Sequence, residues 1–337
     1  MNKLTPRKAT LLSLALVVAA SLTACGQGGS GEADAKPEMK TIGISTIVSH
    51  PDLDTLIQGI QDGLKQEGLT EGKDIKVEVQ NAQGNIALAT TIAQKFAADK
   101  VDVIVGVSTP SSLAAVKATE NSSIPVIFTG VSADPAAAGL AKPGNEPLGR
   151  LVTGVYTPDT TVDQLELFGQ LSPDVKKLGF LFNPGEANSV QARTLVDAAA
   201  QTHGWSLVDA TVTSSNDISA AMNSLVGRVD AVILPQDNTV LTGLPAILKI
   251  ATENKLPVYS SDTSSVKEGT VATVATNTYE QGVQTAAMLA KILKGTSAND
   301  IAPEPAGKVA TWVNTTAAEN MGVTVPANIL ETAEIAK

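Results

Sequence analysis

The sequence predicts an α/β protein built from two doubly wound, parallel-sheet lobes. Short β-branched segments alternate with helical patterns along most of the chain. The segment 101–107 is almost entirely apolar, as expected for a parallel strand that is covered on both faces. After the loop at 142–149, which is rich in Pro and Gly, a second series repeats the same order of elements over a similar length. Two such series indicate two lobes of similar architecture.

The first series has its apolar residues at the spacing of strands and amphipathic helices. Leu56, Ile60 and Leu64 recur at helical spacing, and Gly68 follows where a helix C-terminus favours glycine. We expect strands at 41–44, 75–79, 101–107 and 124–128, and helices at 53–64, 86–96 and after Pro110.

The second series continues this alternation towards the C-terminus. Strands are predicted at 178–182, 207–212, 231–234, 257–259, 271–274 and 309–313, and helices at 162–171, 190–200, 218–226, 244–251 and 279–294. The elements after 278 are too few for a third domain, so they must complete the first two lobes. The chain therefore has to pass between the lobes more than once, and we expect the crossings at 152–155, 275–277 and 303–305.

The first residues have the pattern of an export signal. Lys3, Arg7 and Lys8 precede a short apolar run that is below the ~20 residues needed to span a bilayer. Cys25, the single cysteine, follows small residues in a segment that resembles a bacterial lipoprotein signal; the second interpretation is an ordinary signal peptide with an incidental cysteine. We predict a signal peptide at 1–24, lipid attachment at Cys25 and a polar, flexible tether at 25–39.

The composition argues against several classes of function. The net charge is −10, which disfavours a nucleic-acid partner. With one cysteine and two histidines, neither a disulfide nor a metal site is expected, and we interpret His50 and His203 as structural. The segment 106–110 fails the nucleophile-elbow pattern at its last position, and no dinucleotide-binding glycine motif follows a strand. We therefore expect no catalytic residues, no cofactor and no enzymatic activity.

Polar loops follow the strands of both series. After 101–107 come Ser108, Thr109, Ser111 and Ser112 around Pro110, at the start of a predicted helix. Free N–H groups and the positive end of the helix dipole at such a point can hold a carboxylate. Further loops of this type lie at 131–135, 183–189, 235–239 and 260–263. Because ligands bind beyond the carboxyl ends of parallel strands, facing loops of two lobes predict a binding cleft.

These residues resemble a known family. The chain is similar to the periplasmic-binding-protein-like substrate-binding lipoproteins of ABC transporters, of the tryptophan/tyrosine uptake type. The resemblance covers nearly all of 40–326 and rests on the segments 50–54, 108–112, 124–130, 134–140, 183–191, 235–239 and 266–275, with Tyr279 and Gly282.

The resemblance implies a type I periplasmic-binding-protein fold with three hinge crossings. We place lobe 1 at 40–154 and 278–305, and lobe 2 at 155–277 and 306–337. It also implies an extracytoplasmic, lipid-anchored monomer that delivers a small ligand, an aromatic amino acid by preference, to an ABC permease and its ATPase. The Ser111 and Ser112 amides would hold the ligand carboxylate, and Asp262 would hold its ammonium group. The expected ligand-binding residues are Thr46, Ser108, Thr109, Ser111, Ser112, Asp134, Tyr156, Asn188, Ser189, Asp237, Asn238, Ser261 and Asp262.

The sequence leaves the ligand open. Thr46, Tyr156 and the 261–262 pair depart from the family pattern at positions expected in the cleft. Phe128, Tyr156 and Tyr259 are candidates for a wall beside the ligand side chain. A sugar or nucleoside is the second ligand class, but it would need more stacking rings than the loops offer. A sensory module that presents its ligand to a receptor and a membrane-anchored hydrolase are two further classes of function.

Overall fold

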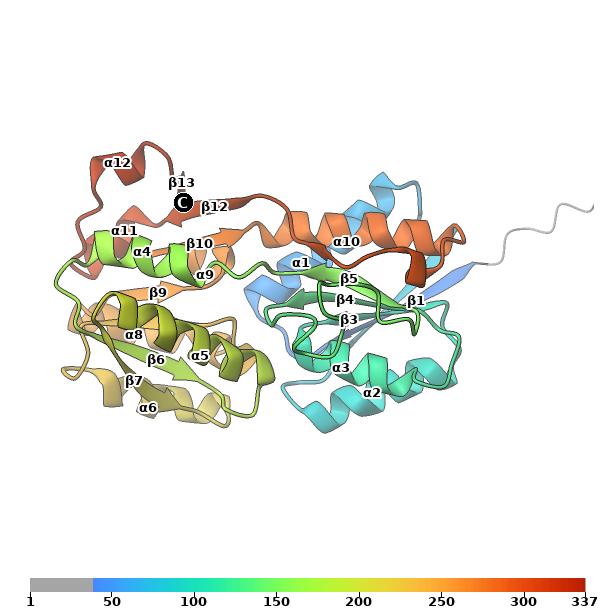
Figure 1. Cartoon of the computed structure of the whole chain (residues 1–337), viewed down its shortest axis with the longest axis horizontal. Coiled ribbons are helices and arrows are strands. Elements are labelled where there is room, and N and C mark those ends of the chain that lie inside the picture. The colour runs from blue at the N-terminus through green and yellow to red at the C-terminus, as the bar shows by residue number, and fades with distance from the viewer. Residues whose placement is uncertain (1–38, 337) are drawn as a thin grey trace, which may run out of the picture. The chain divides into compact units, whose positions relative to one another are not determined.

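The alternating strands and helices expected from the sequence are present in the computed structural model, which describes residues 39–336 (Figure 1). The predicted signal peptide, Cys25 and all of the predicted tether except Met39 lie outside the described residues. The strands are β1 (Lys40–Thr46), β2 (Ile75–Asn81), β3 (Val103–Val107), β4 (Val126–Val131), β5 (Val152–Tyr156), β6 (Lys177–Phe182), β7 (Ser206–Thr211), β8 (Ala231–Leu234), β9 (Val258–Ser260), β10 (Ala272–Thr276), β11 (Glu304–Pro305), β12 (Val309–Val313) and β13 (Glu334–Ile335). The α-helices are α1 (Pro51–Gln66), α2 (Ile86–Ala98), α3 (Thr109–Ala118), α4 (Thr161–Leu171), α5 (Ala187–Thr202), α6 (Ile218–Leu225), α7 (Asn238–Leu241), α8 (Leu244–Asn254), α9 (Thr263–Glu268), α10 (Thr278–Leu293), α11 (Thr315–Asn320) and α12 (Ala327–Leu330), with short 3₁₀ helices at Ser215–Asp217 and Ala298–Asp300.

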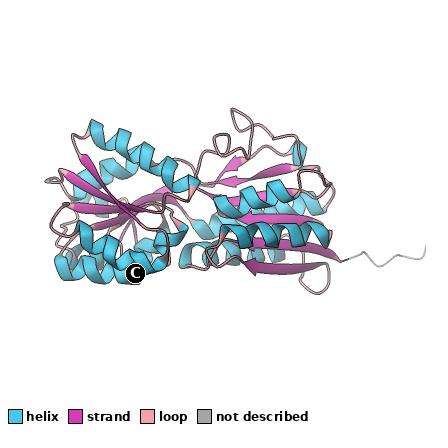
Figure 2. Ribbon diagram, turned by 90° about the horizontal axis from the view of Figure 1, so that it is seen from below, coloured by secondary structure: helices cyan, strands magenta, loops and turns pink. Residues whose placement is uncertain are grey.

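Lobe 1 is a doubly wound sheet of six strands in the order β11-β5-β4-β3-β1-β2. Every neighbouring pair in this sheet is parallel. Helices α2 and α3 pack together on one face, and α1 and α10 pack together on the other (Figures 1 and 2). Ile44, Val105 and Phe128 are fully buried between these layers. The predicted parallel sheet with helices on both faces is confirmed.

Lobe 2 has its own hydrophobic core around two smaller sheets. Strands β7-β6-β8-β9 form a parallel sheet, and β10-β12-β13 form a second sheet in which β12 runs antiparallel to β10. Helix α4 packs on α5, and α6 packs on α8. Tyr259 is fully buried in this core, where its ring stacks on Phe168 at a centroid distance of 4.2 Å.

The described chain passes three times between the two lobes. It leaves the six-stranded sheet after β5, returns between β10 and α10, and leaves again between β11 and β12. The segment 152–155, expected to be a crossing, instead lies inside β5, where Val152 and Val155 are buried and the strand pairs with β4. The first crossing therefore begins after Tyr156. The segment 303–305, also expected to be a crossing, instead contains β11, which pairs with β5, so the third crossing begins after β11. The limits given above for the two lobes stay a prediction.

Close packing of α1 against α10 joins the beginning of lobe 1 to a segment far along the chain. Two glycines allow this approach. A Cβ atom on Gly59 would lie 2.2 Å from the carbonyl oxygen of Tyr279, and one on Gly282 would lie 2.2 Å from that of Leu56. The neighbouring atoms are backbone, so they cannot turn away as a side chain would. The returning α10 thus completes lobe 1 only because these positions lack side chains.

We expect the substitution Gly59→Ala to destabilise lobe 1. An added methyl group forces the two helix backbones apart, and overpacking of this kind costs about 1–3 kcal/mol of unfolding free energy. Urea unfolding followed by circular dichroism measures the loss. The matched control is Gly307→Ala, because nothing lies within 4 Å of the added carbon there. Equal unfolding midpoints for the two variants would contradict the close helix contact.

Candidate functional site

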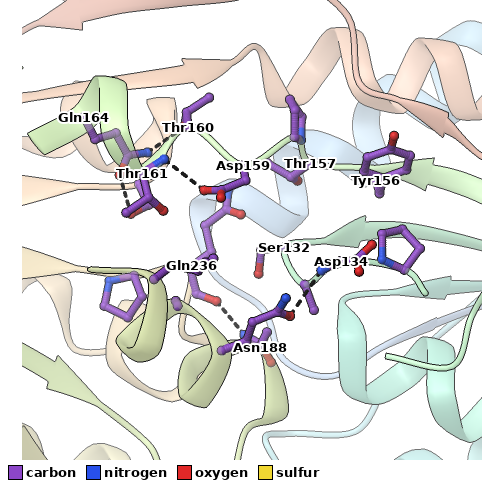
Figure 3. Close-up of a pocket in the computed structure, with 18 residues that line it drawn as sticks. Ser132, Asp134, Tyr156, Thr157, Asp159, Thr160, Thr161, Gln164, Asn188 and Gln236 are labelled. Atoms are coloured by element: carbon purple, nitrogen blue, oxygen red, sulfur yellow. Dashed lines mark hydrogen bonds between the residues drawn. The ribbon is translucent and has the colours of Figure 1, made fainter. Parts of the chain in front are cut away.

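A cavity of about 370 Å³ lies between the two lobes, beside the first crossing (Figure 3). Lobe 1 contributes the loop after β4 and the end of β5, and lobe 2 contributes the start of α5 and the loop after β8. All of these are strand-end positions or the helix starts that follow them. The polar or charged lining residues are Ser132, Asp134, Tyr156, Thr157, Asp159, Thr160, Thr161, Gln164, Asn188, Gln191, Gln236 and Ser261.

A narrower inner part adjoins this cavity. The two parts share Ser132, Thr157, Asn188 and Gln236 in their walls. The inner part then continues towards the start of α1 and α3, where it is lined by His50, Asp52, Leu53, Thr109, Gly130, Asn238, Leu241 and Gln281. The cleft therefore has a wide outer compartment and a narrow, polar inner end.

Hydrogen bonds between the lobes hold the cleft closed. The backbone N–H of Asp134 in lobe 1 donates to Oε1 of Gln191 on α5, at 3.1 Å. Deeper in, Oγ of Ser264 on α9 donates to Oδ1 of Asp52 at the start of α1, also at 3.1 Å. Both contacts require the lobes to be close together, so the described arrangement is a closed one.

The first turn of α3 presents polar groups that have no partner. The hydroxyl oxygens of Ser108, Thr109 and Ser111 are buried and make no hydrogen bond, whereas Ser112 donates to the carbonyl oxygens of Gly106 and Ser108. Ser108 also has a φ of +84°, an unfavourable backbone conformation for a residue with a side chain. Unpartnered buried hydroxyls at a helix N-terminus suit an anionic group such as a carboxylate.

The start of α5 forms the opposite wall. Asn188 donates through Nδ2 to the carbonyl oxygen of Gln236 at 2.8 Å, and its Oδ1 is buried without a partner. Beside it, Ser189 donates to the carboxylate of Asp237 at 2.6 Å. Asn188 thus keeps a polar atom free for a ligand, while the hydroxyl group of Ser189 stabilises the loop that contains Asp237.

Asp237 is a structural carboxylate. It is fully buried and accepts hydrogen bonds from Ser189 Oγ, from Asn183 N at 2.6 Å and from Val240 N at 2.9 Å. Burial raises its pKa to about 7, and the nearby carboxylate of Glu186 adds to this rise, while the hydrogen bonds oppose it. These contacts join the ends of β6 and β8 to the starts of α5 and α7, and so position Asn188.

Asp262 serves its own helix in the same way. Its carboxylate caps α9 by accepting from Ser265 N and Ser265 Oγ, both at 2.7 Å, and the residue is fully buried. Burial, with a contribution from Asp52, raises its pKa to about 7. The carboxylate is therefore already occupied and does not line either part of the cleft.

The residues predicted from the sequence divide into two groups. Those that line the cleft are Thr109, Asp134, Tyr156, Asn188, Asn238 and Ser261. Those that do not line it are Thr46, Ser108, Ser111, Ser112, Ser189, Asp237 and Asp262. Thr46 is buried and donates to the carbonyl oxygen of Val48. Phe128 and Tyr259, suggested as walls, lie fully buried in the lobe cores. The ligand contacts of all these residues stay predictions.

Sequence reasoning misses several lining residues. Ser132 and Gln236 belong to strand-end loops that the sequence identifies, but which side chain faces inward depends on the turn. Gln191 lies three residues after Asn188, on the same face of α5, so helical spacing could have identified it. His50, interpreted as structural from the sequence, also lines the inner part. Thr157 lies on the first crossing, which begins later in the chain than the sequence predicts.

The lining of the cleft consists mainly of groups that bind through hydrogen bonds. No group of three or more His, Cys, Asp or Glu residues able to hold a metal ion occurs in the part of the chain that the structure describes. Among residues 39–336, no helix is long and apolar enough to cross a membrane. Hydroxyl, amide and carboxyl groups surround a cavity of a size typical of small-molecule sites.

Comparison with known proteins agrees with this geometry. A tyrosine-binding protein of Clostridioides difficile is 36% identical over 288 residues, covering 83% of this chain and 82% of that protein. The structure of an ABC domain from Streptococcus pneumonia in complex with L-Trp is 31% identical and has a TM-score of 0.82, with 88% of this chain and 99% of that chain covered.

A further solved structure is described as open and ligand-free. The ligand-free, open structure of a substrate binding protein with adhesive properties from Clostridium difficile is 35% identical, yet its TM-score is 0.65, with 89% of this chain and 99% of that chain covered. The arrangement described here is thus more similar to the L-Trp complex than to the open structure, in agreement with its contacts across the cleft.

A family model supplies the assignment. The model described as ABC transporter substrate binding protein matches residues 41–337. Proteins of this family bind solutes outside the cytoplasm for ABC transporters and are not enzymes. With this match over most of its length, the chain belongs to the family of ABC transporter substrate-binding proteins.

Proposed function

We propose that this protein is the lipid-anchored binding component of an ABC importer and that its ligand is an aromatic amino acid. The observation that carries the ligand proposal is the set of buried polar atoms without partners on both walls of the cleft, at Thr109 and Asn188. Leaving such atoms unpaired is unfavourable, so a polar ligand that satisfies them stabilises the closed form. The relatives named for tyrosine and L-Trp support an amino acid as that ligand.

The two compartments suit the two ends of an aromatic amino acid. The narrow inner end is polar and includes Thr109 at the N-terminus of α3, which suits the ligand carboxylate. The outer compartment is wide enough for a ring, and Tyr156, Pro135 and Leu195 give it apolar surface. The ligand would therefore lie with its ring in the outer compartment and its charged groups turned towards the inner end, whose volume of about 10 Å³ admits a group of about the size of a water molecule.

A sugar fits this lining less well. Sugar sites stack the flat faces of the ligand on aromatic rings, and Tyr156 is the one Phe, Tyr or Trp residue in the described lining of either part. Its hydroxyl group already accepts from Nδ2 of Asn145 at 3.0 Å, which fixes the ring at one edge of the cavity. One ring can cover the side chain of an aromatic amino acid but not both faces of a sugar.

Titration calorimetry of the purified protein with the twenty amino acids tests the ligand class. We expect heat of binding from one or more of L-Trp, L-Tyr and L-Phe, and a rise in melting temperature with the same ligand because it binds only the folded state. The absence of both effects with all three would refute the proposal, and binding of a sugar or nucleoside instead would support the second ligand class.

The variant Asn188→Ala tests the location of the site. It removes an amide whose Oδ1 has no protein partner, so we expect ligand affinity to fall by about tenfold, the effect of losing one hydrogen bond of about 1.4 kcal/mol. The matched control is Asn223→Ala, on an exposed face of α6. Calorimetry that finds equal affinities for both variants would move the ligand away from this cleft.

Membrane attachment through Cys25 has its own test. We expect the wild-type protein expressed in a bacterium to incorporate labelled palmitate and to partition into detergent, because an acylated cysteine buries its chains in lipid. Cys25→Ala should abolish both properties and leave the calorimetric affinity unchanged. A wild-type protein that carries no lipid would support the ordinary signal peptide instead.

A further inference from the structure

A buried histidine lies at the inner end of the cleft, and its ring nitrogens are not satisfied by hydrogen bonds of normal geometry. His50 stands just before α1, and 5% of its surface is exposed. Neither Nδ1 nor Nε2 makes a hydrogen bond of normal geometry within the described protein, and the side chain of Asn238 is a polar neighbour near enough to interact with the ring. The ring lines the narrow inner part of the cleft together with Asp52 from lobe 1 and Asn188 and Asn238 from lobe 2. A buried imidazole in this state lacks at least one partner that a bound molecule could supply.

The surroundings of His50 are negative. The carboxylates of Asp52 and Asp54 on α1, and of Glu186 at the start of α5, all act on its ring. Each is already held by neighbours: Asp54 accepts from Ser49, Glu186 accepts from Asn238 and Thr239, and Asp52 accepts from Ser264 and Thr278. The His50 side of the inner part therefore favours a cation, whereas its Thr109 side, at the N-terminus of α3, favours an anion.

We propose that neutral His50, beside Asp52, is the subsite for a primary ammonium group of the ligand. A ring nitrogen accepts one ammonium N–H, and the Asp52 carboxylate supplies the negative charge. The small ammonium group suits the narrow inner part, where a ring would not fit. This inference rests on the proposed function and deepens it, because it assigns the ammonium end of an amino acid to residues different from the expected Asp262.

The subsite also couples binding to pH. Asn188, Gln236, Asn238 and Leu241 of lobe 2 line the same inner part as the ring, so we expect closure to add to its burial. This burial lowers the pKa of His50 below its ordinary value of 6.5, although the carboxylates of Asp52, Asp54 and Glu186 and the neighbouring Asn238 side chain oppose the shift. Because the pKa of His50 is lower in the closed form, the closed form is favoured when the imidazole is neutral. As the pH falls below about 6.5, the open form takes up a proton, and ligand affinity falls.

The test compares each aromatic amino acid that binds with its deaminated analogue: indole-3-propionate for L-Trp, and 3-(4-hydroxyphenyl)propionate for L-Tyr. Calorimetry at about pH 7.5 measures wild type, His50→Ala and His50→Gln. We expect His50→Ala to bind the amino acid about 10- to 100-fold more weakly, the effect of losing a hydrogen bond to a charged group, and to bind the analogue as wild type does. The Gln variant retains an acceptor oxygen and should keep part of the affinity.

A pH series provides the second readout. Between about pH 7.5 and pH 5.5 we expect the wild-type affinity to fall more steeply than that of His50→Gln, which keeps only the dependence contributed by Asp237 and Asp262, whose pKa values of about 7 lie in the same range. The control is His203→Gln, which alters the second histidine, an exposed residue stacked on Trp205 at the end of α5. It should behave as wild type. Melting curves for all variants show whether each is folded.

The outcomes separate this inference from the proposed function. If wild type binds no aromatic amino acid, the proposed function and the subsite both fail. If wild type binds but the His50 variants keep its affinity and its pH profile, the subsite alone is wrong. Equal weakening of amino acid and analogue would also overturn it, because His50 would then contact another part of the ligand.

Discussion

Polar atoms that the protein itself does not satisfy lie buried in the walls of the closed cleft. On one wall this is the hydroxyl group of Thr109 at the start of α3, and on the other the free amide oxygen of Asn188. An unpaired polar atom is tolerable in an open cleft, where water can reach it, and costly in a closed one. A ligand can therefore shift the equilibrium between the open and closed forms, because a molecule that supplies the missing hydrogen bonds stabilises the closed form. Ligand binding and lobe closure are thus coupled, because the buried polar atoms need hydrogen-bond partners once the cleft is closed.

A scaffold of fully satisfied polar groups surrounds these unsatisfied ones. Asp237 joins strand ends and helix starts in lobe 2, and Asp262 caps α9 near the hinge. Burial raises the pKa of both carboxyl groups to about 7, so their hydrogen bonds must compensate for a considerable desolvation cost. Such residues hold the lining side chains in place without touching the cavity. A polar residue near the cleft can therefore serve the site while facing away from it.

Two sets of polar groups in the cleft favour opposite charges on a ligand. The helix dipole and hydroxyls of α3 suit an anion, whereas the carboxylates around His50 suit a cation. A zwitterion carries both charges close together, so it can use both ends at once, while a neutral sugar can use neither fully. The wide outer compartment then selects by the size and shape of the side chain. This separation of charge recognition from shape recognition is the main physical argument for an amino acid.

Local patterns in the sequence determined the strands, the helices and the polar strand-end loops, because hydrophobic periodicity and helix signals depend only on neighbours along the chain. They also located the polar start of α3 and the loop that contains Asn188. The direction of each side chain was decided by tertiary structure. The polar residues of these loops look alike in sequence, yet Ser112 and Ser189 donate to the backbone and to Asp237, while Asn188 keeps a free oxygen. His50 looks structural in the sequence, and only the packing of two distant parts of the chain places it in the lining of the cleft beside residues of lobe 2.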